Sequence, residues 1–132
     1  MSKEVLKIIS DAMSEMNLNY DFMEWTSKPV YPYFTGEYQE IPTSSEDGEQ
    51  ETTFILNGFA RDVGNDKTAY LELENAKEKI ANYFSKVSGK TVITDKGSAV
   101  AVFYANSLVI PTGDAELKRL QINLTSKEWS VN

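Results

Sequence analysis

The fold of this chain is decided by the stretch Thr52-Thr53-Phe54-Ile55-Leu56-Asn57-Gly58-Phe59-Ala60-Arg61. Its side chains alternate in the way of a strand, with Phe54, Leu56 and Gly58 on one face and Thr53, Ile55 and Phe59 near the other. The pair Asn57-Gly58 allows a second interpretation, because Asn-Gly between apolar runs is a strong hairpin signal. A turn there would leave a very short partner strand, so we favour one continuous strand.

Two stretches on either side of this strand have the apolar spacing of a helix. Residues 2–16 place Val5, Ile8, Ile9, Ala12, Met13 and Met16 on one stripe. Residues 70–88 do the same with Leu73, Ala76, Ile80, Tyr83, Phe84 and Val87. Ser2 is suited to cap the first helix, and Gly89 is suited to end the second. The sequence therefore predicts two amphipathic helices.

The remaining apolar runs read as strands over residues 20–26, 33–41, 90–94, 99–105 and 117–125, with 108–111 continuing the fourth. In the last run Leu120, Ile122 and Leu124 are expected to point inward. The predicted order is α-β-β-β-α-β-β-β. We expect a single α+β domain over residues 1–132, with an antiparallel or mixed β-sheet and two helices packed against it.

Residues 42–51 have no apolar side chain except a proline, and they predict a mobile acidic loop between two strands. Its carboxylates resemble a calcium loop only in charge, because the spaced ligands of an EF-hand do not match. The aromatic segment before it, with Tyr33, Phe34 and Tyr38, is expected to supply core or sheet-face residues. The alternative interpretation is that some of them form an exposed patch that contacts a partner.

Composition excludes several classes of function. The chain has no cysteine and no histidine, so thiolate sites and Ser-His-Asp or Cys-His catalysis cannot be built from it. Its net charge of −7 opposes binding to phosphate backbones. No apolar run approaches the roughly 20 residues of a membrane span, and charges at Lys3 and Glu4 oppose a signal peptide. We expect an intracellular protein without enzymatic activity, cofactor, metal or nucleic-acid ligand.

The layout resembles that of the small tail-completion proteins of long-tailed phages and prophages, the head–tail joining and tail-terminator type. The likeness covers most of the chain. It is carried by the N-terminal helix, Tyr33-Phe34-Thr35-Gly36-Glu37-Tyr38, Glu46-Asp47-Gly48, Phe54-Ile55-Leu56-Asn57-Gly58-Phe59-Ala60-Arg61 and Leu71-Glu72-Leu73-Glu74-Asn75-Ala76-Lys77-Glu78-Lys79-Ile80.

This resemblance implies a virion structural protein and not an enzyme. Such proteins form a ring, typically hexameric, that caps the tail tube and meets the head connector. They are made in the bacterial cytoplasm and end in the virion tail or neck. A long loop of the family reaches into the neighbouring component, and here residues 42–51 are the candidate. The implied partners are other copies of this chain, tail-tube proteins and head-connector proteins.

Two other classes of protein remain open. One is a small intracellular acidic binding or regulatory module, such as an inhibitor whose acidic loop mimics nucleic acid. The other is an enzyme that works through carboxylates or a lysine in a closed cleft. As partner-contact residues the sequence offers Tyr33, Phe34, Tyr38, Glu46, Asp47, Glu49 and Glu51.

In a ring of the kind that the resemblance implies, some of Glu46, Asp47, Glu49 and Glu51 are expected to line the channel for DNA or to contact a basic partner. Replacing Glu46, Asp47, Glu49 and Glu51 together by their amides should impair tail assembly, because the repulsion of phosphate or the attraction to the partner is lost. Counting complete tails by electron microscopy measures this. Unchanged assembly would contradict the role of these carboxylates.

Overall fold

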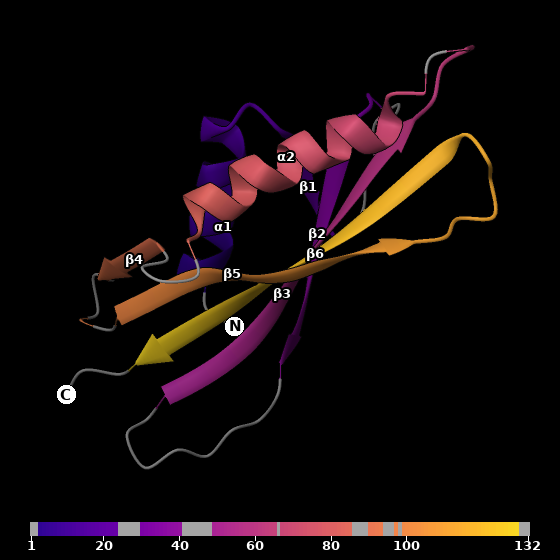
Figure 1. Ribbon diagram of the computed structural model, residues 1–132. Helices are drawn as coiled ribbons and strands as arrows, with labels where there is room; N and C mark the ends of the chain where they lie inside the picture. Colours follow the sequence, from indigo (N-terminus) through magenta and orange to yellow (C-terminus); the bar gives the residue numbers. More distant parts are fainter. Residues whose placement is uncertain are drawn as a thin grey trace.

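The structure is a computed structural model that describes residues 3–23, 30–40, 49–65, 67–85, 90–93, 97 and 99–129, apart from the side chains of residues 40, 49, 50 and 90. The elements follow the predicted order, which confirms the α+β class (Figure 1). They are α1 (Lys3–Glu15), β1 (Asn19–Phe22), β2 (Tyr33–Glu40), β3 (Glu49–Arg61), α2 (Ala69–Tyr83), β4 (Lys90–Ile93), β5 (Ala99–Ile110) and β6 (Leu117–Trp129).

The described strands form one mixed, six-stranded sheet in the order β1-β2-β3-β6-β5-β4. The pair β1–β2 is parallel and the other neighbouring pairs are antiparallel. The central pair consists of β3 and β6, which are 13 residues each and are in register from Glu49 opposite Trp129 to Arg61 opposite Leu117. The strand pairs on either side are shorter. The middle of the sheet is thus its longest ladder.

Strand β3 runs through Asn57 and Gly58 without a turn, as the sequence analysis favoured. The glycine has a packing role here. A Cβ atom at Gly58 would lie 2.5 Å from Cε1 of Phe34 and 3.1 Å from Cδ2 of Leu73, so a larger residue has no space. Gly36 on β2 is equally confined, because its Cβ would lie 2.6 Å from the Phe54 ring. Two glycines therefore let aromatic rings lie against the backbone of the sheet.

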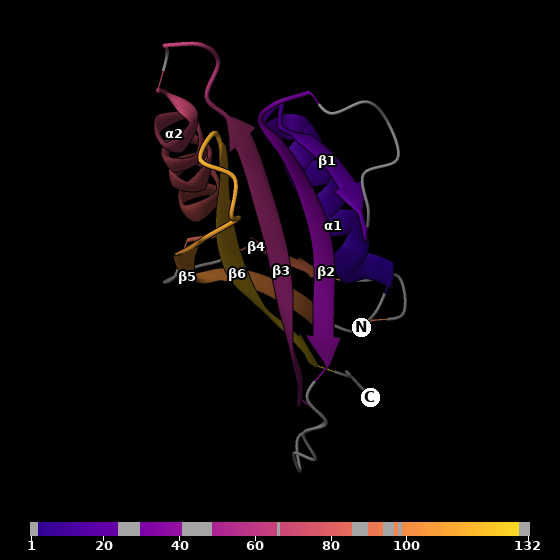
Figure 2. The ribbon, with the colours of Figure 1, turned by 90° about the vertical axis from the view of Figure 1, so that its right-hand side faces the viewer.

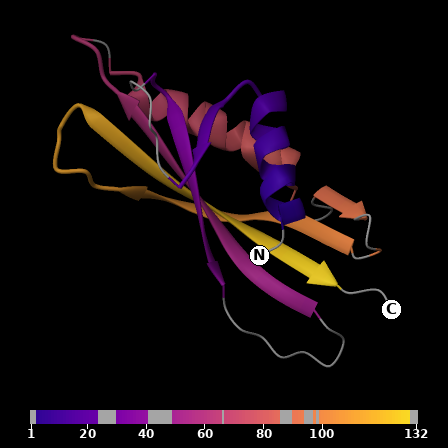
Figure 3. The same ribbon diagram turned by 180° about the vertical axis from the view of Figure 1, so that it is seen from behind.

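Both helices cover the same face of the sheet (Figures 2 and 3). They bury the apolar stripes that the sequence predicts, Val5, Ile9, Ala12 and Met13 from α1 and Leu73, Ala76 and Ile80 from α2. The strands supply the other half of the core, which includes Phe34, Phe54, Leu56, Leu120, Ile122 and Leu124. The inward direction predicted for the last three is confirmed. In the described part of the chain, no helix is long and apolar enough to cross a membrane.

Local hydrogen bonds fix where the helices begin and end. After α1, Asn17 takes a positive φ of 56°, and the N–H of Leu18 donates to the carbonyl of Met13 at 2.9 Å. This is the left-handed helix end that asparagine tolerates. At the start of α2, buried Asp62 accepts a hydrogen bond from the N–H of Ala69 at 3.1 Å. A carboxylate from the preceding strand end thereby caps the helix.

Several predicted boundaries were wrong. Strand β3 begins at Glu49, so residues 49–51 belong to a strand and not to the acidic loop. The other residues of the predicted loop, 42–48, lie outside the described residues. Strand β1 ends at Phe22, and Met23, which the prediction included in the strand, has φ 73°; the predicted residues 24–26 lie outside the described residues. Helix α2 ends at Tyr83, and Gly89 lies outside the described residues. Strand β6 continues to Trp129, four residues beyond the prediction.

The close contact between Gly58 and Phe34 predicts an unusual response to substitution. Gly58→Ala should lower the free energy of unfolding by about 1–3 kcal/mol, because the added methyl group forces Phe34 or Leu73 to move. Alanine would otherwise stabilise a strand relative to glycine. Urea unfolding measures the change. Combining it with Phe34→Leu should recover part of the loss, and a strictly additive double variant would contradict the contact.

Candidate interaction surface

The face of the sheet opposite the helices is not covered by any helix of the described chain (Figure 3). We call it the open face. Strand alternation places on it the side chains whose neighbours point into the core: Tyr33 beside Phe34, for example, and Phe59 beside Gly58. Most of these side chains are half-buried by one another. The open face is therefore a packed surface of side chains.

An aromatic–arginine row runs across one end of the open face, made of Tyr31, Tyr33, Phe59, Arg61 and Arg119. Tyr33 stacks on Phe59 with ring centroids 5.1 Å apart, and Tyr31 lies 5.4 Å from Tyr33. The guanidinium of Arg61 lies 5.8 Å from the Tyr31 ring centre, and that of Arg119 lies 5.7 Å from Phe59. Cations over rings and paired rings are favourable in this geometry. The residue types are those enriched at protein interfaces.

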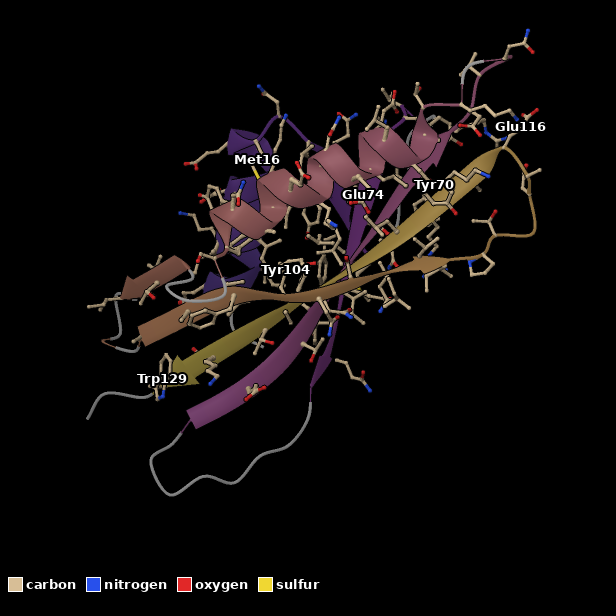
Figure 4. All side chains as sticks on the ribbon, viewed as in Figure 1. Met16, Tyr70, Glu74, Tyr104, Glu116 and Trp129 are labelled. Atoms are coloured by element: carbon tan, nitrogen blue, oxygen red, sulfur yellow. The ribbon has the colours of Figure 1, made fainter. Side chains whose placement is uncertain are left out.

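The charges at this end of the sheet are partly compensated. Arg61 contacts Asp114 at 3.3 Å and Glu116 at 3.7 Å, both on the β5–β6 hairpin, where Figure 4 labels Glu116. A hydrogen bond to Tyr31, together with the Asp114 carboxylate, raises the pKa of the Arg61 guanidinium. Burial and the neighbouring Tyr31 raise the pKa of the Tyr33 hydroxyl. The row therefore presents a protonated Tyr33 and a charged Arg61 at neutral pH.

Next to the aromatic–arginine row, Asn57 joins three strands through its side chain. Its amide donates a hydrogen bond to Oε1 of Glu37 at 3.2 Å, and its Oδ1 accepts one from Arg119 at 2.8 Å. Asn57 is only 6% exposed, which is unusual for asparagine. The Nε of Arg119 is buried, and no hydrogen-bond partner for it is found among the described residues. This network fixes the orientation of Arg119 against Phe59.

A second set of amides continues across β6 and β5. Gln121 donates to Asn123 at 3.0 Å, and Asn123 donates to Asn106 at 2.7 Å. The register shift between Tyr104 and Asn106 brings Asn106 onto the open face opposite Asn123. The open face thus carries polar links between adjacent strands, with aromatic and charged groups at one end.

The structure separates the three predicted aromatic contact residues. Tyr33 lies on the open face, in the aromatic–arginine row. Tyr38 lies on the helix side at the end of β2, is 42% exposed and stacks on Phe22 at 6.1 Å. Phe34 is fully buried in the core against Gly58, so its side chain does not reach the surface. Its prediction as a partner contact is wrong, because its position in the strand points it inward.

Of the four acidic residues predicted to contact a partner, the structure describes the side chain of Glu51. Glu51 is exposed on β3, opposite Lys127 of β6. The side chain of Glu49 and the residues Glu46 and Asp47 lie outside the described residues. The described part of the chain holds no group of three or more acidic residues that could bind a metal ion.

Sequence reasoning missed Phe59, Arg119 and Asn57 as members of a surface site. Their alternation was visible, but the register that brings β2, β3 and β6 together was not. Tyr33, Phe59 and Arg119 are consecutive partners across three strands, from distant parts of the sequence. Only the pairing of the strands reveals them as one row.

Two depressions lie beside the sheet edges. One, about 380 Å³, lies between α1 and β1 and is lined by Leu6, Lys7, Ser10, Tyr20, Asp21 and Phe22. The other, about 530 Å³, lies between α1 and β4 and includes Ile8, Val92 and Ile93. Each depression is bounded by α1 and by a strand at the edge of the sheet, and apolar side chains form part of its lining. Both linings also include charged side chains, among them Lys7.

No model of a known protein family matches this chain, and no curated protein sequence is significantly similar to it.

The network around Asn57 predicts a specific loss of stability. Asn57→Leu should lower the free energy of unfolding by about 1–3 kcal/mol, because it keeps the volume but removes one partner of half-buried Arg119. Urea unfolding measures this loss. As the matched control, Asn106→Ala removes an exposed amide on the same face and should change stability by less than about 0.5 kcal/mol. Equal effects of the two variants would show that the Arg119 network is not stabilising.

Proposed function

We propose that this chain is a structural protein of a phage or prophage that acts in tail completion or head–tail joining. It works through protein–protein contacts and forms a ring on the tail tube. The observation that carries the proposal is the sheet itself, with a helix-free face that displays the aromatic–arginine row. Rigid aromatic side chains and arginines on a packed sheet are suited to bind a protein surface.

The charge of the chain supports the same proposal. At −7 per copy, a ring of several copies carries a large negative charge. If the acidic residues face the lumen, they keep phosphate from adhering while DNA passes. The open face, in contrast, holds Arg61 and Arg119 and is the side offered to tail-tube or head-connector proteins. The chain thus acts in the bacterial cytoplasm during assembly and in the virion tail or neck afterwards.

Affinity capture followed by mass spectrometry tests this function. The tagged protein is used to recover partners from a lysate of its own source cell after prophage induction. Tail-tube or head-connector proteins are the expected partners. The variant Tyr33→Ala/Arg61→Ala should recover several-fold less of them, because it removes the aromatic–arginine contacts without touching the core.

Leu71→Ala is the matched control, since Leu71 is 59% exposed on α2, on the other side of the molecule. It should recover the same proteins as the unchanged chain. Recovery of a host enzyme or regulator without any virion protein would overturn the proposal. That result would favour the acidic regulatory module instead.

A further inference from the structure

The second half of β5 is an open edge of the sheet. Strand β4 pairs with β5 only between Ala99 and Val102 (Figure 1). Residues 106–110 of β5 pair with β6 on one side, and on the other side no described strand accompanies residues 105–110. Among the described residues, no strand pairs with the backbone N–H and C=O groups on that side, and such an edge can bind a further strand.

The side chains of this edge do not protect it. Residues 105–110, Ala-Asn-Ser-Leu-Val-Ile, contain no charge and no proline. Leu108 is 44% exposed and Val109 is 50% exposed. Soluble proteins usually block such edges with lysine, proline or a bulge that faces outward. The register shift between Tyr104 and Asn106 lies at the start of this segment, and residues 106–110 beyond it carry neither a charge nor a proline. An edge of this composition is typical of a strand that pairs with a partner.

The opposite edge of the sheet has matching properties. Strand β1 accompanies only the first half of β2, from Tyr33 to Gly36. Beyond it, residues 37–39 of β2 have no described strand on their outer side. The step between the two strands exposes Phe22 at 38%, Met23 at 62% and Tyr38 at 42%. This edge therefore also combines free backbone groups with exposed apolar side chains.

The two edges are compatible in direction and in charge. Counting through the antiparallel pairs β2–β3, β3–β6 and β6–β5, strand β5 runs opposite to β2 and hence to β1. Joined side by side, the two edges would form an antiparallel ladder. Residues 105–110 of β5 carry no charge, whereas Asp21 and Glu37 lie at the β1–β2 edge. The acidic edge would therefore meet an uncharged strand and not a like charge.

We propose that the β5 edge of one copy pairs with the β1–β2 edge of a second copy of this chain. This pairing would supply the subunit contact of the proposed ring. Its role in a ring on the tail tube rests on the proposed function. The two surfaces are different, so the contact is head-to-tail and can be repeated until a ring closes. Each new copy adds its sheet to the one before.

The depression between α1 and β1 completes the contact. A continued sheet keeps its faces, so side chains of β5 on the helix side meet the helix side of β1. Val109 is on that side, because its partner Leu120 is in the core. The depression of about 380 Å³ beside Phe22 lies at the same edge and is suited to receive an apolar side chain.

Cross-linking between single-cysteine variants tests the pairing, because the chain has no cysteine of its own. Val109→Cys and Met23→Cys carry different tags, are mixed and are treated with a short bis-maleimide, which tolerates small shifts of register. We expect the mixed Val109–Met23 product. Val63→Cys, at a site 74% exposed outside both edges, is the matched control and should not cross-link.

Sedimentation at several protein concentrations gives a second readout on the unmodified chain. Val109→Lys should weaken self-association about tenfold or more, because a lysine on an edge strand opposes pairing. Val63→Lys carries the same charge change and should associate like the unmodified chain. Neither site is in the core, so both variants are expected to fold.

Two results would overturn the proposal. Dominant Val109–Val109 products would indicate a two-fold contact through β5 alone. A chain that sediments as a monomer and gives no cross-link would show that its edges do not pair. The proposed function is tested separately. If the edges pair but no virion protein is recovered, the proposed function is wrong and the pairing stands. If virion proteins are recovered by a chain that is monomeric, the pairing is wrong and the proposed function stands.

Discussion

The ladder between β3 and β6 is the constraint on which the other parts of the structure depend. Because side chains alternate strictly, a shift of one residue between these strands would exchange the core face and the open face. In the observed register Phe54, Leu56, Ile122 and Leu124 all lie under the helices. Gly58 adds a second condition, since only a residue without a side chain admits Phe34 at that point. Register and packing thus specify each other.

The same register determines the chemistry of the open face. Tyr33, Phe59 and Arg119 form one row only because β2 and β6 flank β3 at these positions. The half-buried Arg119 is then held by Asn57, which is itself almost fully buried. A polar network of this kind costs desolvation and is stabilising only when its geometry is kept. The open face therefore holds Arg119 in one orientation through a partner that is itself buried.

The sequence predicts the two helices, the continuous β3 and the element order, because apolar periodicity is a local property. It does not predict which strands lie at the edges. Tyr33, Phe34 and Tyr38 look alike in the sequence, yet the structure places them on the open face, in the core and at an edge. Similarly, residues 99–110 read as strand, but the place of this strand near the border of the sheet follows from the pairing of β6 with both β3 and β5. Contacts between distant segments carry that information.

Charge and edges together limit how copies of this chain can meet. A net charge of −7 opposes contact between two copies, and salt largely screens this repulsion between charges more than about 10 Å apart. The strand at residues 105–110 is uncharged and adds nothing to the repulsion. There, backbone hydrogen bonds can form without bringing acidic side chains together. The acidic surface therefore disfavours non-specific association between copies. The strand edges remain as the contact through which a second copy can bind.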